Sequence, residues 1–293
     1  MEKFRQDKAN TAKFEPKNPL KSKIIAAVAP HAGWYYSGAI AARAAAALSA
    51  FYGDGARPGE EQPYTAAVLG GHLPEGMPAL FAMEDAADTP LGAVEIDAGL
   101  RETLIKNFHG IPGFKTAEDR YQDNTVEVLL PMIKYFFPNV KLLWLRLPAD
   151  LRSFDAGKIL VKTAASLNRR LLVLGSTDLT HYGSNYGFSP RGYGREALEW
   201  VKTVNDKRFI DAVEEGNPAL VLERAEKEHS ACSAGAVLGV MGFAAELCAG
   251  KTHASEDSEG RLLAYSTSAD ITMGEGGPLP DSFVGYGAIT WEM

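Results

Sequence analysis

A short apolar run followed by a polar turn is the sequence feature that most constrains how this chain can fold. Residues Leu171–Leu174, bounded by Arg170 and Gly175, are typical of a strand that is buried on both faces. The turn after this strand presents Asp178 and, three residues further on, His181. Ligands of open α/β sheets bind beyond the carboxyl ends of the strands, so this turn places an acid and an imidazole where chemistry is usual.

Two other predicted strands also end beside a histidine. Ile24–Ala29 is followed by His31, and Thr65–Leu69 is followed by His72. Either histidine alone is better explained as a turn residue that hydrogen-bonds the backbone, because short motifs match by chance. Three histidines at three strand ends, with His181 as the third, instead favour one site in which imidazoles bind a metal or transfer protons.

Strands alternate with helices along the rest of the chain. The other strands are predicted at Ala79–Met83, Ala93–Ile96, Val140–Leu147, Leu262–Ser266 and Phe283–Trp291. Helices are predicted at Ala39–Ala50 after a cap at Ser37, and at Leu100–Phe108, Thr125–Phe137, Ser153–Leu167, Arg195–Glu215, Pro218–Lys227 and Ala234–Leu247. This alternation predicts an α/β fold with one central, largely parallel or mixed sheet flanked by helices. No repeat or linker divides the chain, so we expect a single domain over residues 1–293.

Composition argues against several classes of partner. The net charge is −7 and no run of Lys or Arg occurs, so we expect no nucleic-acid partner. The longest apolar stretches are far too short to cross a membrane, and the polar N-terminal segment lacks the apolar region of a secretory signal. Cys232 and Cys248 are the only cysteines, so we expect no disulfide framework and a cytoplasmic location. The sequence leaves the oligomeric state open.

Cys232 lies at the predicted start of a helix, which favours a thiolate. The helix dipole lowers the pKa of a thiol there, and the thiolate is the form that binds metal ions. The alternative is a small buried cysteine that only packs, which is how we interpret Cys248 near the far end of the same helix. His229, three residues before Cys232, is a reserve ligand or a supporting residue, whereas His109 and His253 lie in polar turns and are expected to be solvated.

Asp178 and His181 together suit acid/base chemistry. A carboxylate that accepts a hydrogen bond from one imidazole nitrogen fixes the tautomer and raises the basicity of the other nitrogen. An aspartate that satisfies backbone donors in its own turn is an equally good explanation. Four aromatic residues beside the histidines could line a pocket or merely pack: Trp34, Tyr35, Tyr36 and Tyr182. The sequence contains no phosphate-binding G-x-x-x-x-G-K-[ST] loop and no G-x-S-x-G nucleophile motif.

Three segments resemble the signatures of one known family. Residues Pro30–Gly38 read PHAGWYYSG, Ser176–Gly183 read STDLTHYG, and Leu263–Asp270 read LAYSTSAD, followed by Val284–Gly287. In order and spacing they are similar to motifs of the Memo family, also called AmmeMemoRadiSam system protein B. The fold of that family resembles the class III extradiol dioxygenases, which hold Fe(II) with two histidines and a glutamate.

The resemblance implies a mononuclear metal site. It places His31, His72 and Cys232 at the ligand positions, with Cys232 where the dioxygenases carry a carboxylate. Fe(II) is the first candidate metal. Copper and zinc are alternatives, because a thiolate is a softer ligand than a carboxylate.

The resemblance also implies the residues that would act on a substrate. It places His181 at the position of the catalytic acid/base, with Asp178 nearby. We expect Tyr35, Tyr36 and Tyr182 to contact the substrate, since they lie beside the predicted histidines.

The chain departs from the family's pattern in three places. The family's E-H-S-x-E-x-Q-L-P segment is Asp123–Pro131 here, with Asn124 and Leu129 in place of its histidine and glutamine. The second histidine follows two glycines instead of G-P-[SN], and a serine follows the cysteine where the family has glycine. The metal ligands are therefore kept, while the wall of the site is changed.

Three functional hypotheses follow from these residues. The first is a non-haem metal-dependent oxidoreductase, dioxygenase-like, that acts on a small substrate, with aromatic compounds as one candidate class, and uses His181 as acid/base. The alternative is a non-catalytic binding module that uses the same vestibule for a peptide or a phosphorylated partner. A scaffold with a vestigial site is a third interpretation, which the altered segment with Asn124 and Leu129 supports.

Overall fold

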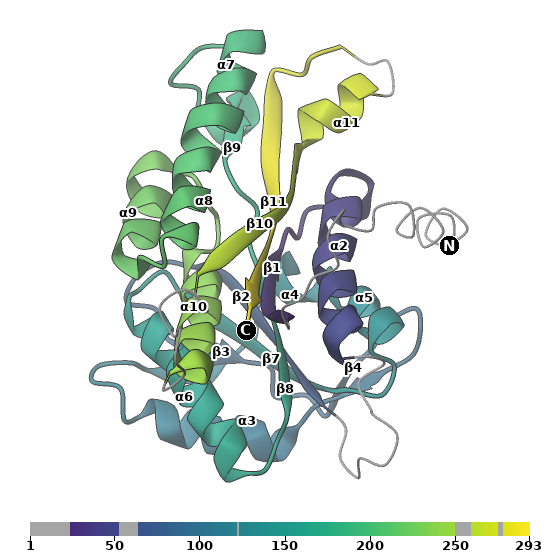
Figure 1. The fold of residues 1–293 in the computed structure, drawn as a ribbon, viewed down its shortest axis with the longest axis vertical. Helices are drawn as coiled ribbons and strands as arrows, with labels where there is room; N and C mark the ends of the chain where they lie inside the picture. The colour runs from purple at the N-terminus through teal and green to yellow at the C-terminus, as the bar shows by residue number, and fades with distance from the viewer. Residues whose placement is uncertain (1–23, 53–63, 122, 250–258, 275–277) are drawn as a thin grey trace.

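A nine-stranded mixed sheet runs through the computed structural model, which describes residues 24–52, 64–121, 123–249, 259–274 and 278–293 (Figure 1). The strand order is β10-β11-β1-β8-β2-β7-β3-β6, and β9 pairs with β11. The four central strands are mutually parallel: β1 (Ile24–Ala29), β8 (Leu171–Ser176), β2 (Thr65–Leu73) and β7 (Lys141–Pro148). Their carboxyl ends therefore meet at one edge of the sheet, where the predicted site residues lie.

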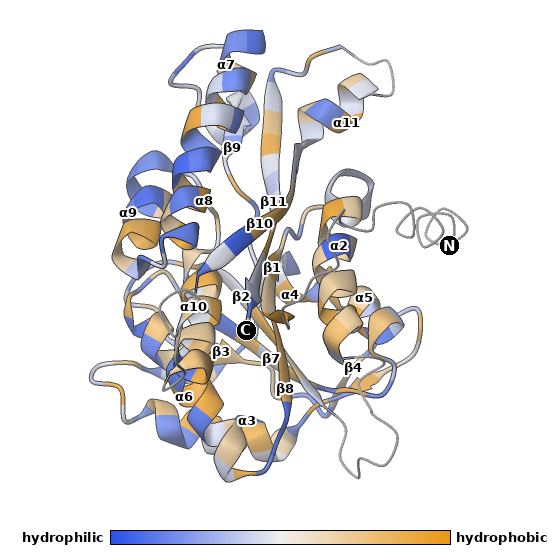
Figure 2. Cartoon of the chain, in the orientation of Figure 1, coloured by the Kyte–Doolittle hydropathy of each residue, from blue (hydrophilic) through white to orange (hydrophobic). Residues whose placement is uncertain are grey.

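Helices cover both faces of this sheet, with a hydrophobic cluster under each layer. One face carries α3 (Ala98–Phe108), α6 (Arg152–Ser166) and α10 (Ala234–Cys248), and the other carries α2 (Trp34–Tyr52) and α5 (Leu130–Phe136). Figure 2 shows the hydrophobic colouring concentrated in the central strands and in α10. Helix α10 approaches α6 so closely that only glycine fits at position 157. A Cβ at Gly157 would collide with the carbonyl oxygen of Gly239.

The remaining elements extend the sheet or cover its ends. The strands are β3 (Ala79–Phe81), β4 (Ala86–Ala87), β5 (Val94–Glu95), β6 (Thr116–Glu118), β9 (His181–Gly183), β10 (Gly260–Thr267) and β11 (Ser282–Glu292). The helices are α4 (Asn124–Glu127), a short 3-10 helix (Ser184–Tyr186), α7 (Arg195–Trp200), a π-helical turn (Val201–Asn205), α8 (Asp206–Glu214), α9 (Pro218–Glu228) and α11 (Ser268–Gly274). The part of the chain that the structure describes holds no helix long and apolar enough to cross a membrane.

The structure confirms the α/β class and corrects several element boundaries. The predicted helix Thr125–Phe137 is two helices, α4 and α5, and Pro131 lies in the first turn of the second. The predicted cap at Ser37 is wrong, because α2 begins at Trp34 and Ser37 therefore lies within the helix. The Ser37 hydroxyl donates to the carbonyl of Ala32, which precedes the helix. The helix predicted over Arg195–Glu215 contains the π-helical turn.

Two loop predictions have different outcomes. Part of the predicted loop Met273–Asp281 is the end of α11, which the sequence did not reveal, because its residues show no clear helical pattern. The predicted loop Gly53–Pro63 lies outside the described residues, as does His253.

Candidate metal site

The structure brings together the three residues predicted to ligate a metal. His31 lies in the turn between β1 and α2, His72 lies near the end of β2, and Cys232 lies just before α10. Two glycines let these segments approach. A Cβ at Gly70 would collide with Thr125, and one at Gly71 would collide with Ser233. The unusual glycine pair before His72 therefore has a packing reason.

The donor atoms of this cluster have the spacing that a bound metal requires. One ligand atom from each residue lies within 4.8 Å of the other two. Nε2 of His31 is 3.3 Å from Nε2 of His72 and 3.4 Å from Sγ of Cys232. Tetrahedral ligands at ordinary zinc distances are separated by about 3.3 Å for two nitrogens and about 3.5 Å for nitrogen and sulfur. The three residues therefore fit a metal ion.

The second nitrogen of each imidazole is held by a partner, which aims Nε2 at the cluster. Nδ1 of His31 is 2.7 Å from the Ser176 hydroxyl, and Nδ1 of His72 is 3.1 Å from Oδ2 of Asp123. Arg146 donates to the same Asp123 oxygen at 3.1 Å. Such partners fix the tautomer and orientation of a metal-binding histidine.

Sequence reasoning missed these three partners. Ser176 belongs to the STDLTHYG segment and Asp123 begins the altered segment, so both were close to recognised motifs. Arg146 had one signal, a charge between Leu145 and Leu147 near the end of the mainly apolar run Val140–Leu147. The contacts of these residues with the histidines, direct or through Asp123, depend on the packing of segments that are distant in sequence. No local sequence pattern encodes that packing.

Electrostatics favour a thiolate beside two imidazolium groups when no metal is bound. Burial acts against ionisation of Cys232, but the charge and hydrogen bond of His31 and the hydrogen bond of His72 hold the pKa of the thiol well below its usual range. Burial likewise opposes charge on His72, yet hydrogen bonds with Asp123 and Cys232 raise its pKa to about 10. The site therefore stabilises positive charge next to sulfur, which is the charge that a metal cation would supply.

Cys232 obtains this stabilisation differently from the sequence-based expectation. It lies before Ser233, the N-cap residue of α10, and is thus outside the first turn of the helix. Its Sγ accepts a hydrogen bond of 3.3 Å from the backbone N–H of Asp178. The two histidines and this N–H, more than the helix dipole, favour the thiolate.

Asp178 joins the metal cluster to His181. Its Oδ1 accepts hydrogen bonds from the backbone N–H groups of His31, at 2.8 Å, and Ala32, at 3.3 Å. Its Oδ2 lies 3.8 Å from Nε2 of His181. Burial raises the pKa of Asp178, but the charge and the backbone N–H of His31, together with the nearby imidazole of His181, outweigh burial and lower it. Asp178 therefore satisfies backbone donors of the turn after β1, and not of its own turn, and lies near His181 without a hydrogen bond to its ring.

A buried network supports the loop that carries His181. Asp206 is fully buried, and its carboxylate accepts hydrogen bonds from the backbone N–H of Thr180, from the Thr180 hydroxyl and from the Tyr265 hydroxyl. Burial raises the pKa of Asp206 to about 6. A Cβ at Gly285 would collide with this carboxylate, so the strand beside it requires glycine.

The aromatic residues predicted to contact substrate lie in different environments. Tyr35 and Tyr36 are exposed at the start of α2, with 56% and 42% exposed area. Tyr182 has no exposed surface: its ring stacks on Phe283, and its hydroxyl donates to the carbonyl of Gly192. The structure therefore leaves no face of Tyr182 open to a ligand. Tyr186, which the sequence did not single out, stacks on His181 at 4.9 Å between ring centroids.

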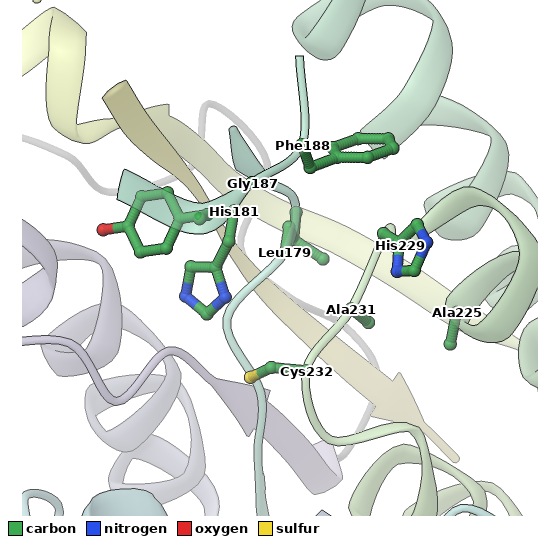
Figure 3. Close-up of a pocket in the computed structure, with 9 residues that line it drawn as sticks. Leu179, His181, Gly187, Phe188, Ala225, His229, Ala231 and Cys232 are labelled. Atoms are coloured by element: carbon green, nitrogen blue, oxygen red, sulfur yellow. The ribbon is translucent and has the colours of Figure 1, made fainter. Parts of the chain in front are cut away.

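A cavity of about 330 Å³ opens beside Cys232 (Figure 3). Its walls include Leu179, His181, Tyr186, Phe188, His229 and Cys232. The cavity gives a small molecule a route to the sulfur atom and to His181 at the same time. Within the described ranges, the cluster that could hold a metal does not include His229, so the structure does not use this residue as the reserve ligand.

The remaining cysteine and histidine are separate from the site. Cys248 is fully buried in the hydrophobic cluster under α10. His109 is exposed, and its Nε2 lies 3.5 Å from the Thr116 hydroxyl.

The fold and the site define an α/β protein with a His/His/Cys cluster, able to hold a metal ion, at the ends of parallel strands. Comparison with known proteins shows the family within this class: the chain belongs to the Memo family. A family model described as Memo-like protein matches residues 3–290. The resemblance found in the sequence motifs is therefore confirmed.

Individual relatives agree with this assignment, and one solved structure is similar in fold. A MEMO1 family protein of Pyrococcus abyssi is 31% identical over 276 residues, which are 91% of this chain and 86% of the relative. A MEMO1 family protein of Nitrosopumilus maritimus is 28% identical over 286 residues, which are 94% of this chain and 88% of the relative. Uncharacterized protein JW3007 from Escherichia coli K12 is similar in structure, with a TM-score of 0.51, 11% identity, and 92% of this chain and 100% of that chain covered. This likeness shows the fold.

Proposed function

We propose that the chain binds one metal ion through His31, His72 and Cys232 and acts as a non-haem metal-dependent oxidoreductase on a small substrate. The observation that carries this proposal is the three-donor cluster beside a cavity that also reaches His181. Three protein donors leave coordination positions open, as catalytic metal sites require. A closed structural site would instead use a fourth protein ligand.

Iron(II) is the first candidate for the metal. Two imidazoles and one anionic ligand resemble the donor set of non-haem iron enzymes, in which a carboxylate is the anion. Copper and zinc are the alternatives, because the thiolate of Cys232 is a softer donor. A bound redox metal ion would supply a Lewis acid for the substrate and an electron source for chemistry with oxygen.

His181 is the proposed acid/base residue. Its side chain lines the cavity and is about one-third exposed, so it can meet a substrate. Oδ2 of Asp178, at 3.8 Å, stabilises the imidazolium that forms when His181 accepts a proton from a substrate hydroxyl. Stacking on Tyr186 orients the ring while leaving its nitrogens available.

The exposed aromatic residues support a second candidate, a binding module without turnover. Trp34, Tyr35 and Tyr36 are all exposed at the beginning of α2, directly after His31. Exposed aromatic side chains are typical of surfaces that bind other molecules. In this interpretation the metal would shape the vestibule for a peptide or a phosphorylated partner.

Metal analysis together with oxygen consumption distinguishes the two candidates. Protein purified anaerobically without a histidine tag should contain about one metal ion per chain. An oxidoreductase should consume oxygen with at least one member of a catechol panel, whereas a binding module should hold metal and consume none. A preparation that holds no metal after reconstitution with iron, copper or zinc would contradict both. His109→Ala is the matched control, because His109 is exposed and outside the cluster.

A further inference from the structure

The cavity beside the metal cluster has an imidazole on each of two facing walls. Figure 3 shows His181 and Cys232 on one side and His229 on the other, with Phe188 above the space between them. His181 and Cys232 belong to the proposed reaction, whereas His229 has no part in it. A substrate that fills the cavity from the sulfur atom outward would end at His229.

His229 lines this cavity from a backbone conformation that is unusual for a histidine. His229 ends α9 in the left-handed region, with φ of 51°, which a residue with a side chain seldom adopts. The ring centroid lies 5.0 Å from that of Phe188. Neither ring nitrogen hydrogen-bonds to another residue in the part of the chain that the structure describes. The ring nitrogens of His229 thus remain available to a ligand in the cavity.

One buried amide ties the two walls together. Nδ2 of Asn205 donates to the hydroxyl of Thr180 and to the carbonyl of Glu228, both at 2.9 Å. Thr180 directly precedes His181, and Glu228 directly precedes His229. The same side chain therefore fixes the separation of the two imidazoles, as a site that measures the length of a ligand requires.

We propose that His229 is a specificity-determining residue, which donates a hydrogen bond to an acceptor group on the end of an aromatic substrate farthest from the metal cluster. The inference rests on the proposed function, because the metal and His181 are taken to hold the opposite end.

The chemistry of the walls defines this substrate class. Leu179, Phe188, Ala225 and Ala231 are apolar and suit a flat ring. The residues that line the cavity include no Lys or Arg, so a phosphate group would lack the charged partners that it normally has. A single acceptor, such as a carboxylate or an amide carbonyl, matches a single imidazole donor.

Four probes separate recognition of the acceptor from recognition of the ring. They are 3,4-dihydroxybenzoate, 3,4-dihydroxybenzamide, 4-methylcatechol and catechol, and their dissociation constants would be measured anaerobically by calorimetry on metal-loaded protein. His229→Gly removes the ring at a position where glycine adopts the required left-handed backbone without strain. His229→Asn keeps a donor and tolerates the same conformation.

We expect the benzoate and the benzamide to bind the wild-type protein about 3- to 10-fold more tightly than 4-methylcatechol. This is the gain in affinity that one additional hydrogen bond typically gives. His229→Gly should abolish this preference while leaving catechol binding unchanged, and His229→Asn should restore part of it. A preference for the benzoate but not the benzamide would assign the acceptor as a carboxylate.

Equal binding of all probes, an unchanged preference in His229→Gly, or no binding of any probe would overturn the inference. Metal content and oxygen consumption, measured on the same wild-type sample, report separately on the proposed function. A sample that holds metal and consumes oxygen without any dependence on His229 would leave the proposed function intact.

Discussion

Two pairs of histidines near Cys232 are held in different ways. In His31 and His72, the nitrogen that faces away from the cluster contacts Ser176 or Asp123. His181 and His229 instead pack their rings against Tyr186 and Phe188. Hydrogen bonds fix which nitrogen faces the cluster, whereas a ring contact positions an imidazole and leaves its nitrogens accessible.

This difference separates the roles that the two pairs can perform. A metal ligand needs a fixed tautomer and a fixed direction, which a hydrogen-bonding partner provides. A residue that exchanges protons or recognises a ligand must keep polar atoms accessible, and aromatic contacts allow this. The contrast therefore predicts that substitutions in the first pair affect metal binding and substitutions in the second pair affect turnover or specificity.

The largest expected effect is loss of the metal itself. His31→Ala and His72→Ala should each lose bound metal, because two protein donors are too few for a tight site. His181→Ala should retain the metal and lose turnover by roughly 10²–10⁴-fold, as removal of an acid/base group typically does. Metal stoichiometry beside oxygen consumption checks this. Loss of metal in His181→Ala with full occupancy in His72→Ala would exchange the two roles.

A smaller effect is expected when only the partner of a metal ligand is changed. Asp123→Asn removes the charge that faces Nδ1 of His72, and we expect metal affinity to fall roughly 10- to 100-fold. The dissociation constant can be measured by competition with a chelator. Glu118→Gln is the control, since Glu118 is an exposed acid that pairs with Arg120. An affinity unchanged in Asp123→Asn would mean that packing alone orients His72.

The smallest expected effect concerns the thiol and its pH dependence. The fraction of an ordinary thiol present as thiolate falls about tenfold when the pH is lowered from 7 to 6. The pKa of Cys232 is lowered by His31 and His72, so its thiolate should persist and its rate of alkylation should change little over this interval. Alkylation of metal-free protein, with Cys232→Ser identifying the labelled site, measures this rate.

Labelling of Cys248 provides the comparison. Cys248 is fully buried in the hydrophobic cluster, and we expect it to react later than Cys232. A tenfold loss of Cys232 labelling between pH 7 and pH 6, or faster labelling of Cys248, would remove the thiolate argument.

The sequence predicted the order of strands and helices and the three residues of the cluster better than it predicted their surroundings. Short apolar runs and the turns after them are local signals, and these located His31, His72 and His181. Ser176 and Arg146 come from strands β8 and β7, which pair with β1, just before His31, and with β2, which carries His72. Asp123 comes from the N-cap of α4. Only the tertiary packing of these segments brings Ser176 to His31 and the Asp123–Arg146 pair to His72.

Local patterns also cannot show which way a loop side chain turns. Tyr182 follows His181 directly, and proximity in sequence predicted that both face the substrate. In the structure Tyr182 turns into the hydrophobic cluster with Phe283, while His181 faces the cavity. Adjacent residues of a strand point to opposite sides, and the short strand β9 separates these two in this way.

The π-helical turn Val201–Asn205 restricts how the chain length can change at this point. Each residue of an α-helix advances the side-chain direction by about 100°. Deletion of one residue before Asn205 would restore a regular helix, yet it would turn the residues after the deletion by about 100° relative to α7. Either α7 or the pair Asn205 and Asp206, which both contact Thr180, would then leave its present contacts. The helix could tolerate such a deletion in isolation, but the loop of His181 and the end of α9 would lose their common anchor. Insertions and deletions should therefore be rarer here than the exposed outer face of the helix would suggest.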